Sequence, residues 1–202
     1  MTWTSFVAPM RAALFLGHGA GGGIDAADLV RVSEVCGLAS IAVALVEQPY
    51  RVAGKAIASD RHKLDAAFRA VVEAERPVGV PLFVGGRSAG ARIACRTAKG
   101  LDARGVVALA FPLHPPKDRD RSRLPELLSA GRPVLVVQGT RDAFGTPSDF
   151  PPGARLVAVE GGDHSFKVLE SSGRTQAEVL ARVSEAVSAF VIAELTRSSG
   201  LV

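Results

Sequence analysis

The stretch Val80-Pro-Leu-Phe-Val-Gly-Gly-Arg-Ser-Ala-Gly-Ala91 (VPLFVGGRSAGA) joins an apolar run to very small residues that surround one serine. Within it, Gly86-Arg87-Ser88-Ala89-Gly90 matches the pattern G-x-S-x-G, which occurs where a strand turns sharply into a helix. The corner residue of such a turn is strained, and side chains two positions before and after it would collide, so glycine is needed there. The stretch therefore predicts a strand, a sharp turn and a helix, with the Ser88 hydroxyl lifted clear of the sheet.

Short apolar runs alternate with helical patterns along the rest of the chain. The predicted strands are Ala12–Leu16, Ile41–Val46, Pro81–Val84, Val106–Ala110, Val134–Gln138 and Ala154–Val159. The predicted helices are Asp25–Cys36, Asp60–Glu75, Ala89–Lys99, Leu124–Ser129 and Thr175–Thr196. Because the strands are continuous apolar runs, we expect an α/β fold, a three-layer αβα sandwich with a mainly parallel sheet of about six strands. No linker or repeat divides the chain, so we expect a single domain over residues 1–202.

Composition limits the partners that this chain is expected to bind. Hydrophobic residues make up 48% of the chain and charged residues 22%, which is typical of a globular protein and not of a disordered one. The net charge of +4 is spread along the chain, so we expect no nucleic-acid partner. The densest charged run, Lys117–Arg123, mixes both signs and favours a solvated loop or helix entrance over a binding patch.

The sequence does not indicate export or membrane insertion. The apolar part of Met10–Gly17 is too short for a signal peptide and fits a buried strand, and no apolar run is long enough to span a membrane. Cys36 and Cys95 are too few for a disulfide framework and are expected to be small buried hydrophobes, and no P-loop pattern occurs. We therefore expect a cytoplasmic protein with no cofactor, no metal and no membrane partner, and we make no prediction about its oligomeric state.

A serine hydroxyl becomes a good nucleophile when a base removes its proton and a third group orients that base. His164 lies in the loop after the last predicted strand, and Asp142 lies in the loop after the strand before it. These loops open at the same sheet edge as Ser88, and the chain order serine, aspartate, histidine is one that G-x-S-x-G enzymes use. Taken singly, Asp142 also fits an Asx turn or helix cap and His164 a surface loop, and Asp163 and Asp149 are weaker candidates for the acid.

Attack by a serine on a carbonyl creates an oxyanion, which needs hydrogen-bond donors. The first strand ends in a loop that is poor in side chains, Leu16–Gly23 (LGHGAGGG), beside the predicted serine turn. We expect the backbone N–H groups of Ala20 and Gly21 to join that of Ala89 in binding this oxyanion. Because these donors belong to the backbone, substitutions there would act through shape.

The same glycine-rich loop has a second interpretation. Gly17, Gly19 and Gly22 satisfy the pattern G-x-G-x-x-G between a strand and a helix, and Glu47 ends the second strand where a ribose-binding acid would lie. A dinucleotide-binding domain is therefore an alternative, although it leaves Ser88 and its two partners unexplained.

Five further side chains follow predicted strands and are candidates for substrate binding: His18, Tyr50, Arg51, Arg87 and His114. Arg87 fits an anchoring role as well as a place in the cleft, and His114 fits a pocket wall as well as a turn cap. If Arg51 and Arg87 both face the cleft, an anionic acyl group would be favoured.

Five motifs resemble the α/β-hydrolase superfamily over nearly the whole chain: LFLGHGAGGG, GGRSAGAR, FPLHPPK, QGTRDAFG and GGDHSFK. They are similar in particular to a small, capless group that includes testis-expressed 30 and KAT8 regulatory complex subunit 3 type domains and their bacterial relatives. The resemblance implies that Ser88 is the nucleophile, Asp142 its acid partner and His164 the base. Full-size members of the superfamily begin with two further strands, and only the first ten residues of this sequence are available for them. No inserted lid domain is predicted between the later strands of the sequence.

We therefore expect a serine hydrolase that forms an acyl-enzyme on a small-molecule acyl substrate, such as an ester or thioester. A non-catalytic binding or scaffold module with the same fold is the alternative from another functional class.

Overall fold

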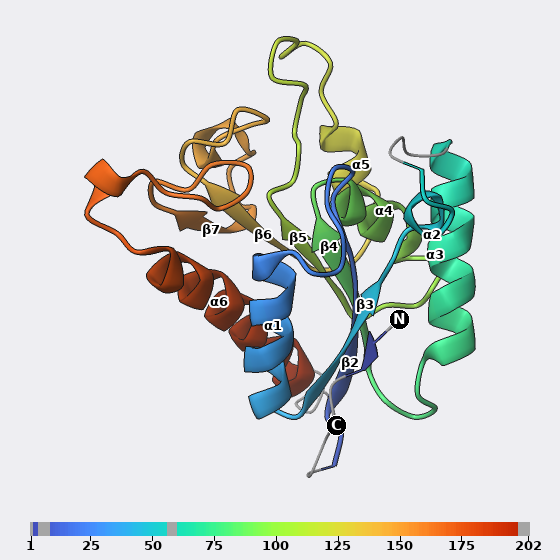
Figure 1. Cartoon of the computed structure of the whole chain (residues 1–202). Helices are drawn as coiled ribbons and strands as arrows, with labels where there is room; N and C mark the ends of the chain where they lie inside the picture. Colours follow the sequence, from blue (N-terminus) through green and yellow to red (C-terminus); the bar gives the residue numbers. More distant parts are fainter. Residues whose placement is uncertain (1, 4–8, 56–59, 198–202) are drawn as a thin grey trace.

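The computed structural model describes residues 2–3, 9–55 and 60–197, the first pair by its backbone alone. A seven-stranded sheet in the order β1-β3-β2-β4-β5-β6-β7 forms its centre (Figure 1). The strands are β1 (Thr2–Trp3), β2 (Ala12–Gly17), β3 (Ile41–Val46), β4 (Leu82–Arg87), β5 (Gly105–Leu109), β6 (Val134–Gly139) and β7 (Arg155–Val159). β1 runs antiparallel to β3, and the six other strands are parallel, which confirms the predicted sheet.

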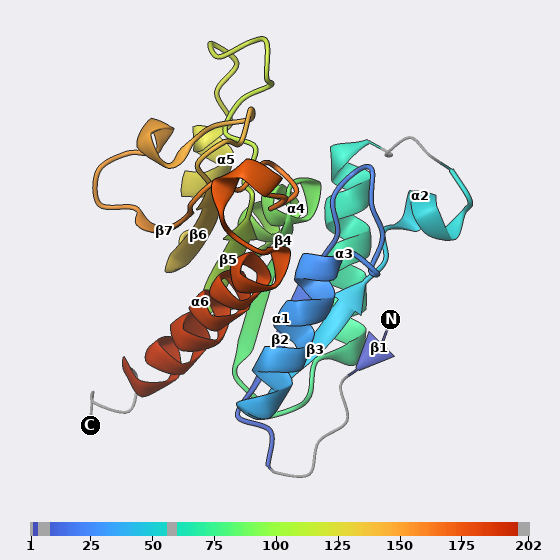
Figure 2. The same ribbon diagram turned by 60° about the vertical axis from the view of Figure 1, so that its left-hand side comes forward.

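Helices cover both faces of the sheet, as Figures 1 and 2 show. The helical elements are α1 (Ala27–Leu38), α2 (Pro49–Val52), α3 (Arg61–Glu75), α4 (Ala89–Thr97), α5 (Leu124–Leu128) and α6 (Gln176–Arg197), with the 3-10 turns η1 (Pro147–Asp149) and η2 (Glu170–Ser172). α1 and α6 pack with one face of the strands in one apolar core, and α3, α4 and α5 pack with the other face in a second core. The architecture is the predicted three-layer αβα sandwich.

The apolar runs of the sequence supply both cores because each parallel strand is covered on both faces. All six residues of β2 are buried, and all six residues of β3 are buried as well. Cys36 and Cys95 lie in α1 and α4, one in each core, and burial raises the pKa of both thiols to about 12. They behave as small hydrophobic residues, as predicted.

The direction of winding reverses between β2 and β4. The chain passes from β2 through α1 to β3 on one side, then returns through α3 to β4 on the other side of β2. In open α/β sheets, ligands bind outside the carboxyl ends of the strands where this reversal occurs. The last residues of β2 and β4 that pair with each other are Gly17 and Gly86, so the crevice opens directly beside Ser88.

Four short elements were not predicted from the sequence: β1, α2, η1 and η2. The loop between β5 and α5 carries the charged run Lys117–Arg123 and rises above the other loops in both views (Figures 1 and 2). Its residues 117–122 are exposed, as a solvated loop predicts, whereas Arg123 is half-buried. In the described ranges, no helix combines the length and the apolar character that crossing a bilayer requires.

Candidate active site

Ser88 sits at the corner between β4 and α4 with φ 52° and ψ −109°, a strained conformation for any residue with a side chain. A Cβ atom on Gly86 would lie 2.7 Å from the carbonyl carbon of Gly90, and one on Gly90 would overlap the carbonyl group of Gly17. Both glycines are therefore required by close backbone packing, in agreement with the G-x-S-x-G prediction. The turn holds the serine at the open end of the sheet.

Three side chains that are remote in sequence form one hydrogen-bonded chain at this edge. His164 Nε2 lies 2.9 Å from Ser88 Oγ, and His164 Nδ1 lies 2.8 Å from Asp142 Oδ2 and 3.0 Å from Asp142 Oδ1. Since an ionised carboxylate only accepts hydrogen bonds, Nδ1–H donates to Asp142, and Nε2 is left to accept the proton of the serine hydroxyl. In this arrangement an imidazole base contacts an alcohol and is oriented by an acid.

Asp142 is buried and held from two further directions. Gln138 Nε2 donates to its Oδ2 at 2.8 Å, and the backbone N–H of Phe144 donates to its Oδ1 at 2.8 Å. The Phe144 ring also lies tilted against the His164 ring, with centroids 4.2 Å apart. The carboxylate and the imidazole are thus fixed in place relative to each other before any ligand arrives.

Asp163 and Asp149, the weaker candidates for the acid, have other roles. Asp163 Oδ1 accepts the backbone N–H groups of Ser165 and Lys167 and so shapes the turn that carries His164. Asp149 accepts from Thr146 at the start of η1.

Three backbone N–H groups in the wall of the cavity around Ser88 have no acceptor in the described part of the chain. They are those of Ala20, Gly21 and Ala89. A Cβ atom on Gly19 would lie 3.5 Å from Ser88 Cβ, which shows how closely this loop approaches the serine. The three N–H groups remain the predicted donors of an oxyanion-binding site.

His18 and Tyr50, predicted to contact substrate, support this loop from behind and are not among the residues that line the cavity around Ser88. His18 is fully buried, with Nδ1–H donating to the Gly19 carbonyl at 2.8 Å and Nε2 accepting the Gln48 N–H at 3.0 Å. The Tyr50 hydroxyl donates to the Ala20 carbonyl at 3.0 Å, and burial raises the pKa of this hydroxyl, which keeps it a donor. Both side chains turn inward because the loop folds back over them.

Arg87 both lines the cavity and anchors the loop that carries the histidine. Its Nη2 donates to the His164 carbonyl at 3.0 Å and to Ser165 Oγ at 2.7 Å, and its Nε lies 3.4 Å from Asp28 Oδ2 on α1. Burial raises the pKa of Asp28, although the positive charge of Arg87 acts in the opposite direction. Arg87 therefore ties three segments together beside Ser88.

Arg51 and His114, also predicted to contact substrate, are not among the residues that line the cavity around Ser88. Arg51 is exposed on α2. His114 is buried, its Nδ1–H donates to the Pro115 carbonyl at 2.9 Å, and its ring lies close to Gly145 behind the Asp142 loop.

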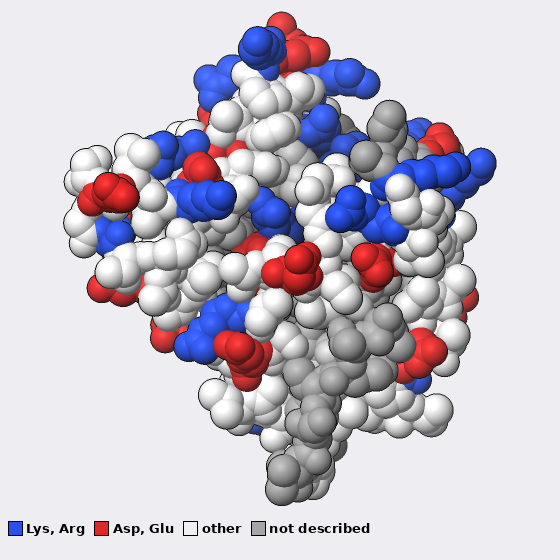
Figure 3. Space-filling model, viewed as in Figure 1, with Lys and Arg blue, Asp and Glu red and all other residues white. Residues whose placement is uncertain are grey.

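The cavity around Ser88, which we call the serine cavity, has a volume of about 450 Å³. Five residues in its wall were not predicted as site residues: Arg92, Pro112, Arg123, Phe144 and Ser165. Arg92 lies four residues after Ser88 on α4, a spacing that places both on one helix face. Nothing in the sequence indicates Arg123, because the path of the long loop decides where it lies. Figure 3 shows that Lys and Arg side chains predominate on the upper half of this face, where the loops after the strands lie.

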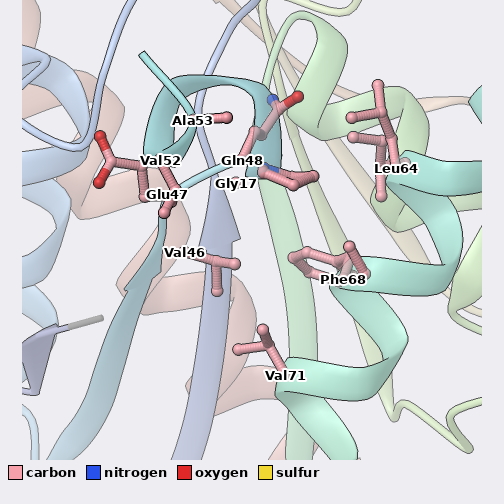
Figure 4. Close-up of a pocket in the computed structure, with 12 residues that line it drawn as sticks. Gly17, Val46, Glu47, Gln48, Val52, Ala53, Leu64, Phe68 and Val71 are labelled. Atoms are coloured by element: carbon pink, nitrogen blue, oxygen red, sulfur yellow. The ribbon is translucent and has the colours of Figure 1, made fainter. Parts of the chain in front are cut away.

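A second cavity of about 330 Å³, which we call the apolar cavity, opens between β3, α2 and α3 (Figure 4). Its wall consists mainly of aliphatic and aromatic side chains, among them Val46, Leu64, Phe68 and Val71. No residue lines both cavities.

The geometry of the first loop removes the basis of the dinucleotide interpretation. A dinucleotide-binding loop leads directly into a helix whose N-terminus meets the phosphates. Here residues 18–26 separate β2 from α1, and Gly17 and Gly19 pack closely against the serine turn. The Glu47 side chain is exposed and extends away from the apolar cavity that it borders (Figure 4). Among the described residues, no group of three or more His, Cys, Asp or Glu side chains could hold a metal ion.

Comparison with protein families gives one match that covers most of the chain. A family model described as "Alpha/beta hydrolase domain" matches residues 10–192. Its extent includes all six parallel strands and the residues that line the serine cavity.

Several solved structures have the same fold. Est1E from Butyrivibrio proteoclasticus, with bound ferulic acid, has a TM-score of 0.71 at 17% identity over 93% of this chain and 90% of that chain. XC6422 from Xanthomonas campestris, an a/b serine hydrolase without lid, has a TM-score of 0.63 at 18% identity over 91% and 84%. The type II thioesterase YbtT of the yersiniabactin pathway has a TM-score of 0.58 at 18% identity over 91% and 97%. These likenesses show the fold of this chain.

Proposed function

Because this chain belongs to the alpha/beta hydrolase domain family, we propose that it is a serine hydrolase that cleaves a small ester, thioester or similar acyl substrate. The observation that carries the proposal is the hydrogen-bonded chain from Ser88 through His164 to Asp142. The names of the similar structures support it, since they include an esterase that binds ferulic acid, a serine hydrolase and a thioesterase.

In the proposed mechanism, Ser88 Oγ attacks the acyl carbon while His164 Nε2 removes the hydroxyl proton. The imidazolium that forms is stabilised by the carboxylate of Asp142, which also holds Nδ1–H in place and so fixes the tautomer. The 2.9 Å separation between Nε2 and Oγ is within the range for direct proton transfer.

Negative charge that develops on the carbonyl oxygen is stabilised by the N–H of Ala89 together with those of Ala20 and Gly21. One such donor contributes about 3–4 kcal/mol to lowering a barrier of this kind. Tyr50 and His18 fix the loop that carries two of these donors, so they act through its shape.

The tetrahedral intermediate then collapses, and the imidazolium returns its proton to the leaving alcohol or thiol. A water molecule deprotonated by His164 attacks the acyl-enzyme, the second tetrahedral intermediate releases the carboxylic acid, and Ser88 regains its proton. Every proton in the cycle passes through the same imidazole nitrogen.

A fluorophosphonate probe tests the proposal, because it reacts with serines that are activated in this way. We expect covalent labelling of Ser88, located by mass spectrometry, together with turnover of 4-nitrophenyl acetate. Both should be lost in Ser88→Ala and retained in Ser171→Ala, which removes an exposed serine far along the chain. If the intact protein shows neither labelling nor turnover, a binding or scaffold role replaces the enzymatic one.

We also propose that, within the alpha/beta hydrolases, this chain is most similar to the group of testis-expressed 30 and KAT8 regulatory complex subunit 3 type domains. It rests on Arg87 within the serine turn, on the His-Pro-Pro sequence after β5 and on the Arg-Asp-Ala-Phe-Gly loop.

A further inference from the structure

The charges in the wall of the serine cavity are not balanced. Among the described residues, its lining contains four side chains that are basic or can become so, Arg87, Arg92, Arg123 and His164, and no aspartate or glutamate. Three of them have a carboxylate partner behind the wall: Arg87 with Asp28 at 3.4 Å, Arg92 with Glu126 at 2.6 Å and His164 with Asp142 at 2.8 Å. Within the described ranges, Arg123 has no carboxylate within ion-pairing distance.

The nearest acidic groups are already used by other arginines. Glu126 accepts two hydrogen bonds from Arg92, at 2.6 and 2.8 Å, and a further one from Arg96. Arg96 also pairs with Asp65 at 2.6 Å. Arg92 and Arg96 thus use both carboxylates of this network, and within the described ranges the positive charge of Arg123 is left without one.

Arg123 is placed by its backbone and not by an ion pair. It caps the N-terminus of α5, and its N–H donates to the Leu113 carbonyl at 2.7 Å. Its guanidinium makes one hydrogen bond in the described part of the chain, from Nη1 to the Pro112 carbonyl at 3.3 Å. Burial and the neighbouring charge of Arg92 lower the pKa of Arg123, so a positive charge is disfavoured there without a counter-ion.

We propose that the serine cavity binds a negatively charged group of the substrate, a carboxylate or a phosphate, with Arg123 as its principal contact and Arg92 beside it. The planar guanidinium presents paired N–H donors that match either anion. Arg92 lies one helical turn beyond Ser88, and both residues line the serine cavity. A single small molecule can therefore place its charged group at the arginines and its scissile acyl bond at Ser88. This inference deepens the proposed hydrolase function and rests on it for the identity of the substrate.

Matched ester pairs test the inference and show which side of the substrate carries the charge. For an anionic acyl group, mono-4-nitrophenyl adipate is compared with 4-nitrophenyl hexanoate, and for an anionic leaving group, 4-acetoxybenzoate is compared with its methyl ester. We expect kcat/KM to be about tenfold higher for the charged member of at least one pair at low salt, and this preference to shrink as ionic strength rises.

Arg123→Gln should lower the ratio of kcat/KM for the charged and neutral esters about tenfold, and Arg123→Lys should restore part of it. The matched control is Arg121→Gln, an exposed arginine of the same loop whose loss changes the net charge equally and should leave the ratio unchanged. Equal ratios in the wild-type protein and Arg123→Gln, with turnover of the neutral esters present, overturn the inference and leave the hydrolase proposal standing.

Binding provides a readout that does not need turnover. Adipate and inorganic phosphate are titrated separately, by calorimetry, into Ser88→Ala and into Ser88→Ala/Arg123→Gln, and thermal melting establishes that both are folded. We expect at least one of the two anions to bind about tenfold more weakly to the double variant. Absence of binding, or equal binding to both proteins, would overturn the anion site whatever the outcome of the labelling experiment.

Discussion

The serine cavity and the apolar cavity lie at the same edge of the same sheet but have opposite linings. The serine cavity is lined mainly by residues of loops and of the start of α4, and its side chains include three arginines and a histidine. The apolar cavity is lined mainly by residues within β3, α2 and α3, such as Val46 and Phe68 (Figure 4).

This difference separates the groups that can react from the groups that stabilise the fold. Loops after parallel strands present polar groups and unpaired backbone N–H groups to one crevice, whereas helix and strand faces supply the apolar contacts beneath it. Substitutions in the serine cavity should therefore act on turnover, and substitutions in the apolar cavity should act on the free energy of unfolding.

The largest effect is expected from Asp142→Asn in the serine cavity. An asparagine can present its amide N–H to His164 Nδ1 and so favour the tautomer that is unable to accept the serine proton. We expect kcat for 4-nitrophenyl acetate to fall by about 10³–10⁴-fold while the melting temperature changes little. Asp163→Asn is the matched control, because its Oδ1 can still accept the two backbone N–H groups of its turn. A similar loss in both variants would contradict the assignment of Asp142.

The opposite pattern is expected from Phe68→Ala in the apolar cavity. Phe68 is 4% exposed and packs near Gly17, so its truncation leaves a void in the core of α3 and α4. We expect a loss of about 3–5 kcal/mol in the free energy of unfolding, measured by urea titration. The folded fraction should keep kcat/KM within about threefold of wild type. A large fall in turnover without a loss of stability would mean that the two cavities work together.

Arg87→Gln probes a residue that belongs to the serine cavity and also to the packing around it. Removing the guanidinium frees the His164 carbonyl and the loop around it, and we expect kcat to fall by about 10–100-fold. Arg87 is a positioning residue in this account, since it acts through the placement of His164.

The same variant should also change the way in which the free energy of unfolding depends on pH. Burial holds the pKa of Asp28 above its ordinary value of 3.8, and loss of Arg87 should raise it further. An acid whose pKa is raised on folding contributes stability that is present below its unfolded pKa and is lost as pH rises through its folded pKa. The unfolding free energy of Arg87→Gln should therefore decline with pH over a wider range above about pH 4 than that of wild type, which adds a slope at the upper end of that range. Asp28→Asn in the Arg87→Gln background should remove the added slope, and a persistent slope would show that another group causes it.

Much of the fold was predictable because continuous apolar runs leave few alternatives to buried parallel strands. The runs at Ala12–Leu16 and Ile41–Val46 became β2 and β3 with nearly the same bounds. The serine turn was predictable for a similar reason, since only glycine fits at Gly86 and Gly90. β1 has two residues and α2 has four, which is too short for a periodic pattern to be visible.

The polar residues of the site were harder to predict because position after a strand does not decide where a side chain points. His18 and Tyr50 follow strands as predicted, yet both turn under the loop and bind its carbonyl groups. Arg51 follows the same strand as Tyr50 and faces solvent. Arg123 enters the serine cavity because a long loop brings it there, and its lack of an ion pair depends on how its neighbours pair with one another.

The smallest effect tests whether the two cavities are independent for substrate binding. Ala67 lines the apolar cavity, and Ala67→Leu should fill part of it. Ala66→Leu, on the exposed side of α3, is the matched control. If acyl chains stay in the serine cavity, which no lid extends, both variants should keep kcat/KM for 4-nitrophenyl butyrate and octanoate within about threefold of wild type, with the shorter ester preferred. A selective loss of octanoate turnover in Ala67→Leu would instead place the acyl chain in the apolar cavity, because only there would the chain meet the added side chain. A wild-type preference for octanoate would contradict the expected preference for the shorter ester.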